Sequence, residues 1–153
     1  MSYAGTLESY QGIELLISAF AEVRRELPDL FLLMIGGSES QVERYTGMAR
    51  DLGLESDCLF TGAVDQPVAK QLLRRADLLT SPRLHGTNTP LKVYEQLSSG
   101  KPLVATRILS HTQVLTDEER RRKTAAAARR LYDTSYSRPV YEGKIRALLE
   151  ILG

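Results

Sequence analysis

The stretch that decides the fold is residues 77–106, DLLTSPRLHGTNTPLKVYEQLSSGKPLVAT. Its two ends are short apolar runs, which predict strands over 77–81 and 103–106. Between them, a polar loop over 82–89 leads into helical spacing over 90–99. A strand, a crossover helix and a second strand in this order form one unit of a parallel sheet.

The same alternation extends through the first 115 residues. Ahead of the quoted stretch, the expected elements are a strand at 2–5, a helix from Ile13 that ends before Pro28, a strand at 30–35, a helix at 39–52, a strand at 57–61 and a helix at 67–76. We therefore predict an α/β fold with a three-layer, doubly wound, Rossmann-like parallel sheet. After Leu115 the alternation stops, and two terminal helices are expected over 117–132 and 138–152.

Composition and charge narrow the function classes. The chain has 153 residues, 42% of them hydrophobic, which suits one globular domain over 1–153 with its sheet core at 2–115. Twenty Lys and Arg against 19 Asp and Glu leave a net charge of +1, which argues against a nucleic-acid binder. One cysteine, the absence of a signal-like start and the lack of a long apolar run predict a cytoplasmic protein whose membrane contact, if any, is peripheral.

The loop at 82–89 offers a place for an anionic ligand, because ligands of doubly wound sheets bind beyond the carboxyl ends of strands. Backbone N–H groups and the helix dipole there favour a diphosphate, to which Thr87 and Thr89 add hydroxyl donors and Lys92 adds a charge. Glu95, about one turn into the helix, can accept hydrogen bonds from the vicinal hydroxyls of a ribose. The same residues also fit an ordinary helix N-cap and a solvated glutamate, so both interpretations stay open.

Residues 81–106 closely resemble the nucleotide-sugar-binding motif of retaining glycosyltransferases of family 4, also called group 1. Three further segments resemble that family in order: GTLESYQGIELLISAF, LFTGAVDQPVAKQLLRRADLL and SHTQVL. The resemblance covers about residues 3–115 and implies the C-terminal half of a GT-B fold, which binds a UDP- or GDP-sugar without a metal or other cofactor. It also implies a partner, the N-terminal acceptor-binding domain, which these residues do not contain.

The resemblance assigns roles to individual positions. Glu95 corresponds to the glutamate that binds the donor ribose, and Val64 to the residue whose backbone meets the nucleobase edge. The remaining positions expected to bind the donor are Gly5, Thr6, Gln11, Gly62, Arg83, Gly86, Asn88, Thr89, Pro90 and Leu91.

The sequence departs from the family pattern at charged positions. Thr87 stands where the family has a glutamate that contacts the transferred sugar, and Thr6 and Gln11 stand where it has an arginine and a lysine. Losing both cations removes charge-assisted bonds to the diphosphate, for which Lys92 or Arg83 could compensate. The expected catalytic set is Glu95, Lys92 and Thr87.

Other conspicuous residues carry weaker hypotheses. His85 and His111 stand on candidate loops and could contact donor phosphate or sugar, whereas no third ligand at metal spacing accompanies them. Cys58 begins an apolar run and is expected in the core. The basic residues 120–123 and 129–130 fit a patch for anionic lipid or, more simply, a solvated helix face.

The sequence therefore predicts the donor-binding domain of a glycosyltransferase of polysaccharide biosynthesis, whose acceptor is a glycan, a lipid or another molecule. This domain would not transfer sugar by itself. The alternative is a non-catalytic nucleotide-binding or interaction domain of the same fold, which the residues at positions 6, 11 and 87 favour. A nucleotide-sugar epimerase is a third interpretation, which the motif at 81–106 fits less well.

Overall fold

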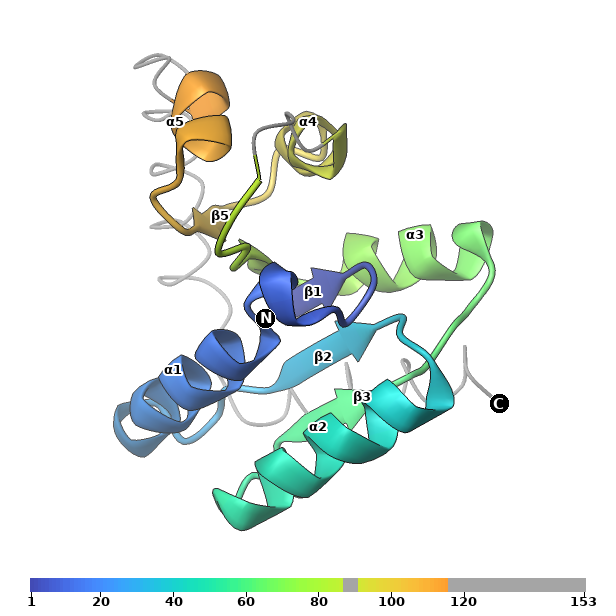
Figure 1. Ribbon diagram of the computed structural model, residues 1–153, viewed down its shortest axis with the longest axis vertical. Helices are drawn as coiled ribbons and strands as arrows, with labels where there is room; N and C mark the ends of the chain where they lie inside the picture. The colour runs from blue at the N-terminus through green and yellow to red at the C-terminus, as the bar shows by residue number, and fades with distance from the viewer. Residues whose placement is uncertain (87–90, 116–153) are drawn as a thin grey trace.

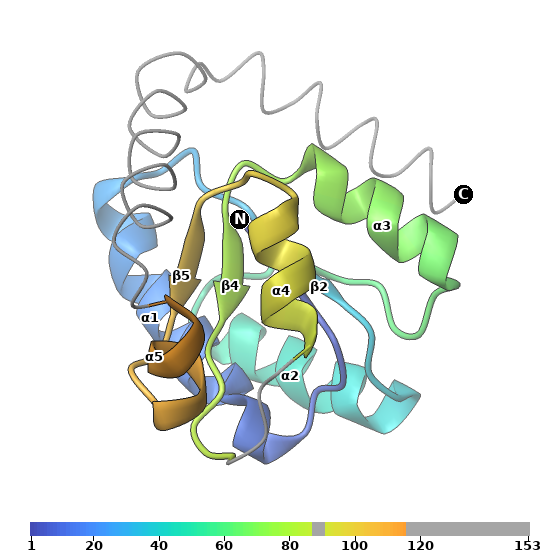
Figure 2. The same ribbon diagram turned by 90° about the horizontal axis from the view of Figure 1, so that it is seen from above.

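The computed structural model describes residues 1–86 and 91–115, which form a five-stranded parallel sheet in the order β3-β2-β1-β4-β5. The strands are β1 (Ser2–Ala4), β2 (Leu32–Ile35), β3 (Cys58–Phe60), β4 (Leu79–Ser81) and β5 (Leu103–Ala105). The helices are a 3₁₀ turn η1 (Ser9–Gln11), α1 (Ile13–Glu26), α2 (Glu39–Asp51), α3 (Gln66–Arg75), α4 (Leu91–Ser98) and α5 (Leu109–Leu115). Figures 1 and 2 show these helices around the sheet.

The side chains of β1 and β2 alternate between two cores, as the period of a strand requires. Tyr3, Leu32 and Met34 pack with the apolar stripes of α1 and α2 in one cluster. Leu33 and Ile35 point to the other face, where they pack with Leu72 of α3. Both faces of the sheet are therefore covered by helices, which explains why β2 reads as an uninterrupted apolar run.

The predicted fold class is confirmed, and each strand and helix expected before Leu109 is present with its ends moved by one or two residues. Strand β4 begins at Leu79 rather than at Asp77, because pairing with β5 starts only there. Two elements were not predicted, η1 and α5, and the second replaces part of an expected loop. The expected terminal helices and the basic residues 120–123 and 129–130 lie outside the described residues.

Capping signals mark the helix starts locally. Ser38 caps α2 through a reciprocal pair of bonds with Gln41, a capping box, and Pro67 stands in the first turn of α3. Gly12 precedes α1 with a φ of 71°, a left-handed conformation that suits glycine. Within the described part of the chain, no helix combines the length and apolarity that crossing a bilayer requires.

Gly36 follows β2 at a point where the backbone leaves no room for a side chain. Its φ is 109°, and a Cβ there would lie 2.3 Å from the carbonyl oxygen of Gly5. Gly36 also donates its N–H to the carbonyl of Gly62 at 2.9 Å, which links the loops after β2 and β3. The chain segments that follow β1, β2 and β3 can therefore approach one another because residue 36 has no side chain.

We predict that Gly36→Ala lowers the free energy of unfolding by about 2–4 kcal/mol, since backbone strain and the clash with Gly5 act together. Gly47→Ala is the matched control, because Gly47 lies within α2 and a Cβ there meets nothing within 4 Å. That variant should gain roughly 0.5–1 kcal/mol from helix propensity. Urea unfolding of both variants checks the pair, and a Gly36→Ala protein as stable as the wild type would contradict the argument.

Candidate functional site

The candidate site lies where the strand order reverses. From β1 the chain moves to β2 and β3 on one side and then returns to β4 and β5 on the other. The loops after β1 and β4 therefore diverge at neighbouring carboxyl ends, the position at which open α/β sheets bind ligands. The two loops are joined by the Leu84 N–H, which donates to the Tyr10 carbonyl at 2.9 Å.

Glycines line the strand ends next to this point. Gly5 ends β1 with a φ of 149° and donates its N–H to the Ile35 carbonyl at 2.9 Å. Gly62 has a φ of 68°, and its carbonyl accepts from the Gly36 N–H and the Thr61 hydroxyl. Val64, which follows, packs its side chain toward the α3 cluster. Because glycines follow β1, β2 and β3, a ligand at this edge of the sheet would meet backbone atoms.

Lys92, from the first turn of α4, reaches the carboxyl end of β1. Its Nζ donates to the Gln11 side-chain oxygen at 3.1 Å and to the Tyr3 hydroxyl at 3.2 Å. The ammonium also lies 4.5 Å from the centre of the Tyr3 ring, within cation–π range. Burial lowers the pKa of Lys92 to about 8, and the neighbouring charge of Arg83 adds to this effect. Lys92 and Gln11, both expected at the site, are thus brought together.

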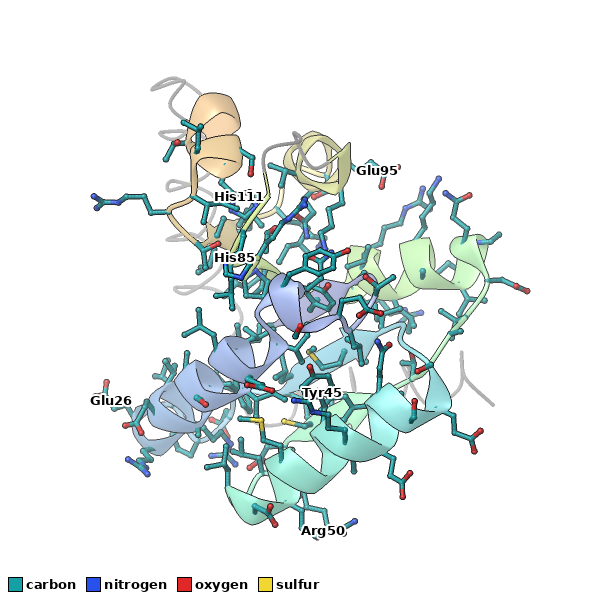
Figure 3. The ribbon with its side chains drawn as sticks, viewed as in Figure 1. Glu26, Tyr45, Arg50, His85, Glu95 and His111 are labelled. Atoms are coloured by element: carbon teal, nitrogen blue, oxygen red, sulfur yellow. The ribbon has the colours of Figure 1, made fainter. Side chains whose placement is uncertain are left out.

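Glu95, one turn further along α4, is exposed and lines a cavity of about 510 Å³ between α3 and α4. Figure 3 shows it projecting from α4, and Lys70 and Arg74 of α3 line the same cavity. Lys92 lines this cavity as well. One helix therefore carries an ammonium and a carboxylate that both face a space large enough for part of a small molecule.

Arg83 braces its own loop in this structure. Its Nε donates to the His85 carbonyl at 2.7 Å, and its guanidinium lies 5.5 Å from the centre of the Tyr10 ring. A Cβ on Gly86 would lie 2.2 Å from a guanidinium nitrogen, so the loop folds closely around this side chain. Arg83 holds the loops after β1 and β4 together, while its charge remains at the site.

A contact of His111 with the donor was one hypothesis from the sequence, and the burial of this side chain contradicts it. The side chain is 1% exposed and joins β4 to the start of α5. Nδ1 lies 2.9 Å from the Thr106 carbonyl, which can only accept, so Nδ1 carries the proton. Nε2 then accepts from the Ser81 hydroxyl at 3.1 Å. The sequence missed this contact because α5 was read as a loop.

The other expected residues fall into two groups. Thr6 is exposed, and its backbone carbonyl accepts from the Tyr3 hydroxyl at 2.7 Å. Thr87, Asn88, Thr89 and Pro90 lie outside the described residues, and Leu91 begins α4. Cys58 packs against the core as expected, and burial raises its pKa to about 12.

Metal-ligating side chains do not gather in the described ranges 1–86 and 91–115: no group of three His, Cys, Asp or Glu residues is placed to hold an ion. The metal-free expectation stays a prediction. Tyr3 contacts Lys92 and was not predicted as a site residue, because nothing in an apolar strand signals a contact with a residue 89 positions away.

Comparison of the sequence with known proteins shows the family to which this chain belongs. The family model described as glycosyl transferases group 1 matches residues 1–134. Phosphatidyl-myo-inositol mannosyltransferase of Mycobacterium leprae is 29% identical over 113 residues, which are 73% of this chain and 29% of that protein. D-inositol 3-phosphate glycosyltransferase of Corynebacterium diphtheriae is 28% identical over 71% of this chain and 26% of its own length. The chain therefore spans less than a third of these relatives.

Solved structures share the fold at low identity. Anabaena HepE in complex with UDP and glucose superposes with a TM-score of 0.67 and 17% identity, over 97% of this chain and 47% of HepE. The C-terminal domain of a group 1 glycosyl transferase from Francisella tularensis gives a TM-score of 0.60 and 16% identity, over 89% of this chain and 85% of that one.

We predict that His111 stays neutral below its ordinary pKa of 6.5, because burial disfavours its charge more than the bond to Thr106 favours it. Acid then favours the unfolded state, so stability present above pH 6.5 is lost as the pH falls below it. The chain has two histidines, so a His85→Gln variant leaves one imidazole to follow by NMR. An imidazole titration midpoint of His111 at or above pH 6.5 would contradict the prediction. The His111→Gln variant should lose less stability than the wild type between pH 7 and 5.

Proposed function

Because this chain belongs to the group 1 glycosyltransferases, we propose that it is the part of such an enzyme that binds the nucleoside-diphosphate-sugar donor. The donor is a UDP- or GDP-sugar, and the whole enzyme transfers its sugar to a glycan, a lipid or another acceptor. A second, N-terminal domain supplies the acceptor site in the full-length enzyme, which is called the parent below. The reaction uses no metal, and the parent acts in the cytoplasm, with peripheral membrane contact where its acceptor is a lipid.

The observation that carries this proposal is the juxtaposition at the switch in strand order. Lys92 and the glycine-lined end of β1 lie beside a cavity that Glu95 also lines. A cation next to exposed backbone suits a diphosphate, and a carboxylate one turn away suits the paired hydroxyls of a ribose. The complexes of HepE with UDP and glucose support the same class of ligand.

For the chemistry, we propose transfer with retention of the anomeric configuration. The bond from the anomeric carbon to the diphosphate oxygen breaks, and its electron pair leaves with the nucleoside diphosphate. The acceptor oxygen forms the new bond on the same face of the sugar, and its proton passes to the leaving diphosphate or to solvent. Backbone dipoles and a cation at the diphosphate stabilise the charge that develops there.

A non-catalytic nucleotide-binding domain remains the second candidate, favoured by the neutral residues Thr6 and Gln11 at the end of β1. The two functions separate in the full-length parent protein. Release of UDP or GDP from a sugar nucleotide in the presence of an acceptor supports the enzyme. A parent that binds the nucleotide and never turns it over supports the second candidate, and transfer by the 153-residue chain alone would contradict the need for a second domain.

We predict that the 153-residue chain binds UDP or GDP at millimolar concentration or below, and that Glu95→Ala weakens this binding roughly tenfold, as expected for loss of a charged hydrogen bond. Isothermal titration calorimetry measures both. Glu43→Ala, an exposed glutamate on α2, is the matched control and should leave affinity unchanged. Failure of the wild type to bind either nucleotide would overturn the proposed function.

A further inference from the structure

Lys92 is a partly buried cation without a counterion in the described structure. Within residues 1–86 and 91–115, its Nζ forms no ion pair with a carboxylate. Its two hydrogen-bond partners, the side-chain oxygens of Gln11 and Tyr3, are neutral. The other charge that acts on it comes from Arg83, which is also positive.

This arrangement is costly for a folded protein. Taking an ammonium out of water without an opposite charge is unfavourable, so such groups usually have a carboxylate partner. A second cation nearby raises the cost further. Polar oxygens and a ring face lower the cost without neutralising the charge. A site that keeps two cations together in this way is complementary to an anion.

The ammonium of Lys92 stands at the carboxyl end of β1, and Lys92 also lines the cavity between α3 and α4. A Cβ on Gly5 would lie 3.0 Å from Nζ and 3.0 Å from the Tyr3 hydroxyl, so the glycine avoids a tight contact with both groups. Thr6 and Gln11, which follow Gly5 before α1, contribute no charge there. The positive charge at this strand end therefore comes from Lys92 of α4, with Arg83 of the loop after β4 nearby, both on the opposite side of the switch point.

We propose that Tyr3 and Gln11 hold the ammonium of Lys92 at the end of β1 as the group that binds the diphosphate of the donor. This inference rests on the proposed function and deepens it, because it makes Gln11 and a buried strand tyrosine the positioning residues of the cation that binds the diphosphate.

The two bonds of the Tyr3 hydroxyl define its role. It donates to the Thr6 carbonyl at 2.7 Å, so its own oxygen is left to accept from Lys92. Burial raises the pKa of Tyr3, which keeps the phenol neutral. A phenolate would neutralise the ammonium, whereas a neutral hydroxyl only fixes its position. Two of the three N–H donors of Lys92 are used in this way, and the third is available for a phosphate oxygen.

The pH dependence follows from the lowered pKa of Lys92, about 8 in the free protein. A diphosphate favours the charged form, so the affinity for UDP or GDP is full below pH 8 and falls as the pH rises through 8. In Lys92→Arg the charge does not titrate in this range, so the fall should disappear. Titration of the nucleotide itself is common to both proteins and cancels in the comparison.

The first experiment measures binding of UDP, GDP, uridine and guanosine to the 153-residue chain by calorimetry at pH 7. Lys92→Met should lose tenfold or more in affinity for the nucleotides, as loss of charge-assisted bonds predicts, with nucleoside binding unchanged. Arg50→Met, which removes an exposed charge at the end of α2, is the control and should bind all four like the wild type.

The second measurement separates a binding role from a structural one. Removing a cation that has no counterion should leave the urea midpoint of Lys92→Met unchanged or raised, whereas a structural lysine would lower it. Tyr3→Phe keeps the ring and removes the hydroxyl, so its nucleotide affinity should fall about threefold and its pH midpoint should move below that of the wild type.

The outcomes distinguish the two proposals. If the wild type binds UDP or GDP and Lys92→Met binds it equally well, the inference about Lys92 is overturned while the proposed function stands. If the wild type binds neither nucleotide, the proposed function itself fails. Should Lys92→Met not fold, the comparison of wild type with Lys92→Arg between pH 7 and 9 decides, and equal pH profiles would overturn the inference.

Discussion

The rest of the structure depends on the pairing of β1 with two neighbours at once. Its register sets Tyr3 opposite Met34 of β2 and Ser2 opposite Leu79 of β4. The Thr80 hydroxyl adds a bond to the Ser2 carbonyl at 3.1 Å. Although β1 has three residues, its pairing on both sides makes it the centre of the sheet and fixes the point at which the strand order reverses.

Successive side chains of β1 face opposite sides of the sheet, so its residues make different contacts. Tyr3 is fully buried in the core formed with α1 and α2, while Ala4 faces α3. Gly5 follows the strand with its N–H bonded to β2, and a Cβ at this position would lie only 3.0 Å from the Nζ of Lys92. A shift of one residue in register would move Tyr3 to the wrong face and remove the hydroxyl that Lys92 contacts.

Much of this architecture could be predicted from the sequence because it is recorded in local patterns. The apolar run ending at Ile35 requires a strand covered on both faces, and the stripe along α1 requires a partner. The short helix α5 has no such signal, since His111 and Ser110 are buried polar residues. His111 is paired through Ser81, 30 positions away, and local spacing does not encode that contact.

The sequence predicted which residues belong to the candidate site but not which of them contact one another. Gly5, Gln11 and Glu95 follow from motif positions, and Lys92 follows from its place near the start of a helix. The contact between Lys92 and Gln11, in contrast, joins residues 81 positions apart and arises only when β1 and β4 pair. Tyr3 carries no signal at all, because a tyrosine in a buried strand is normally packing. The ring of Tyr3 packs in the core, and only its hydroxyl, the polar end of the side chain, contacts Lys92.

The position of α4 couples the two halves of the candidate site. Lys92 and Glu95 are three residues apart on one helix, so their spacing is set by helix geometry and not by a loop. The helix is tied to the sheet by Gln96, whose side chain donates to the Thr80 carbonyl at 3.2 Å, and Thr80 in turn bonds to β1. A displacement of α4 would therefore move the ammonium and the carboxylate together, away from the end of β1. Contacts to a diphosphate and to a ribose on such a helix are gained or lost as one unit, which favours a ligand that carries both groups over free phosphate or a free nucleoside.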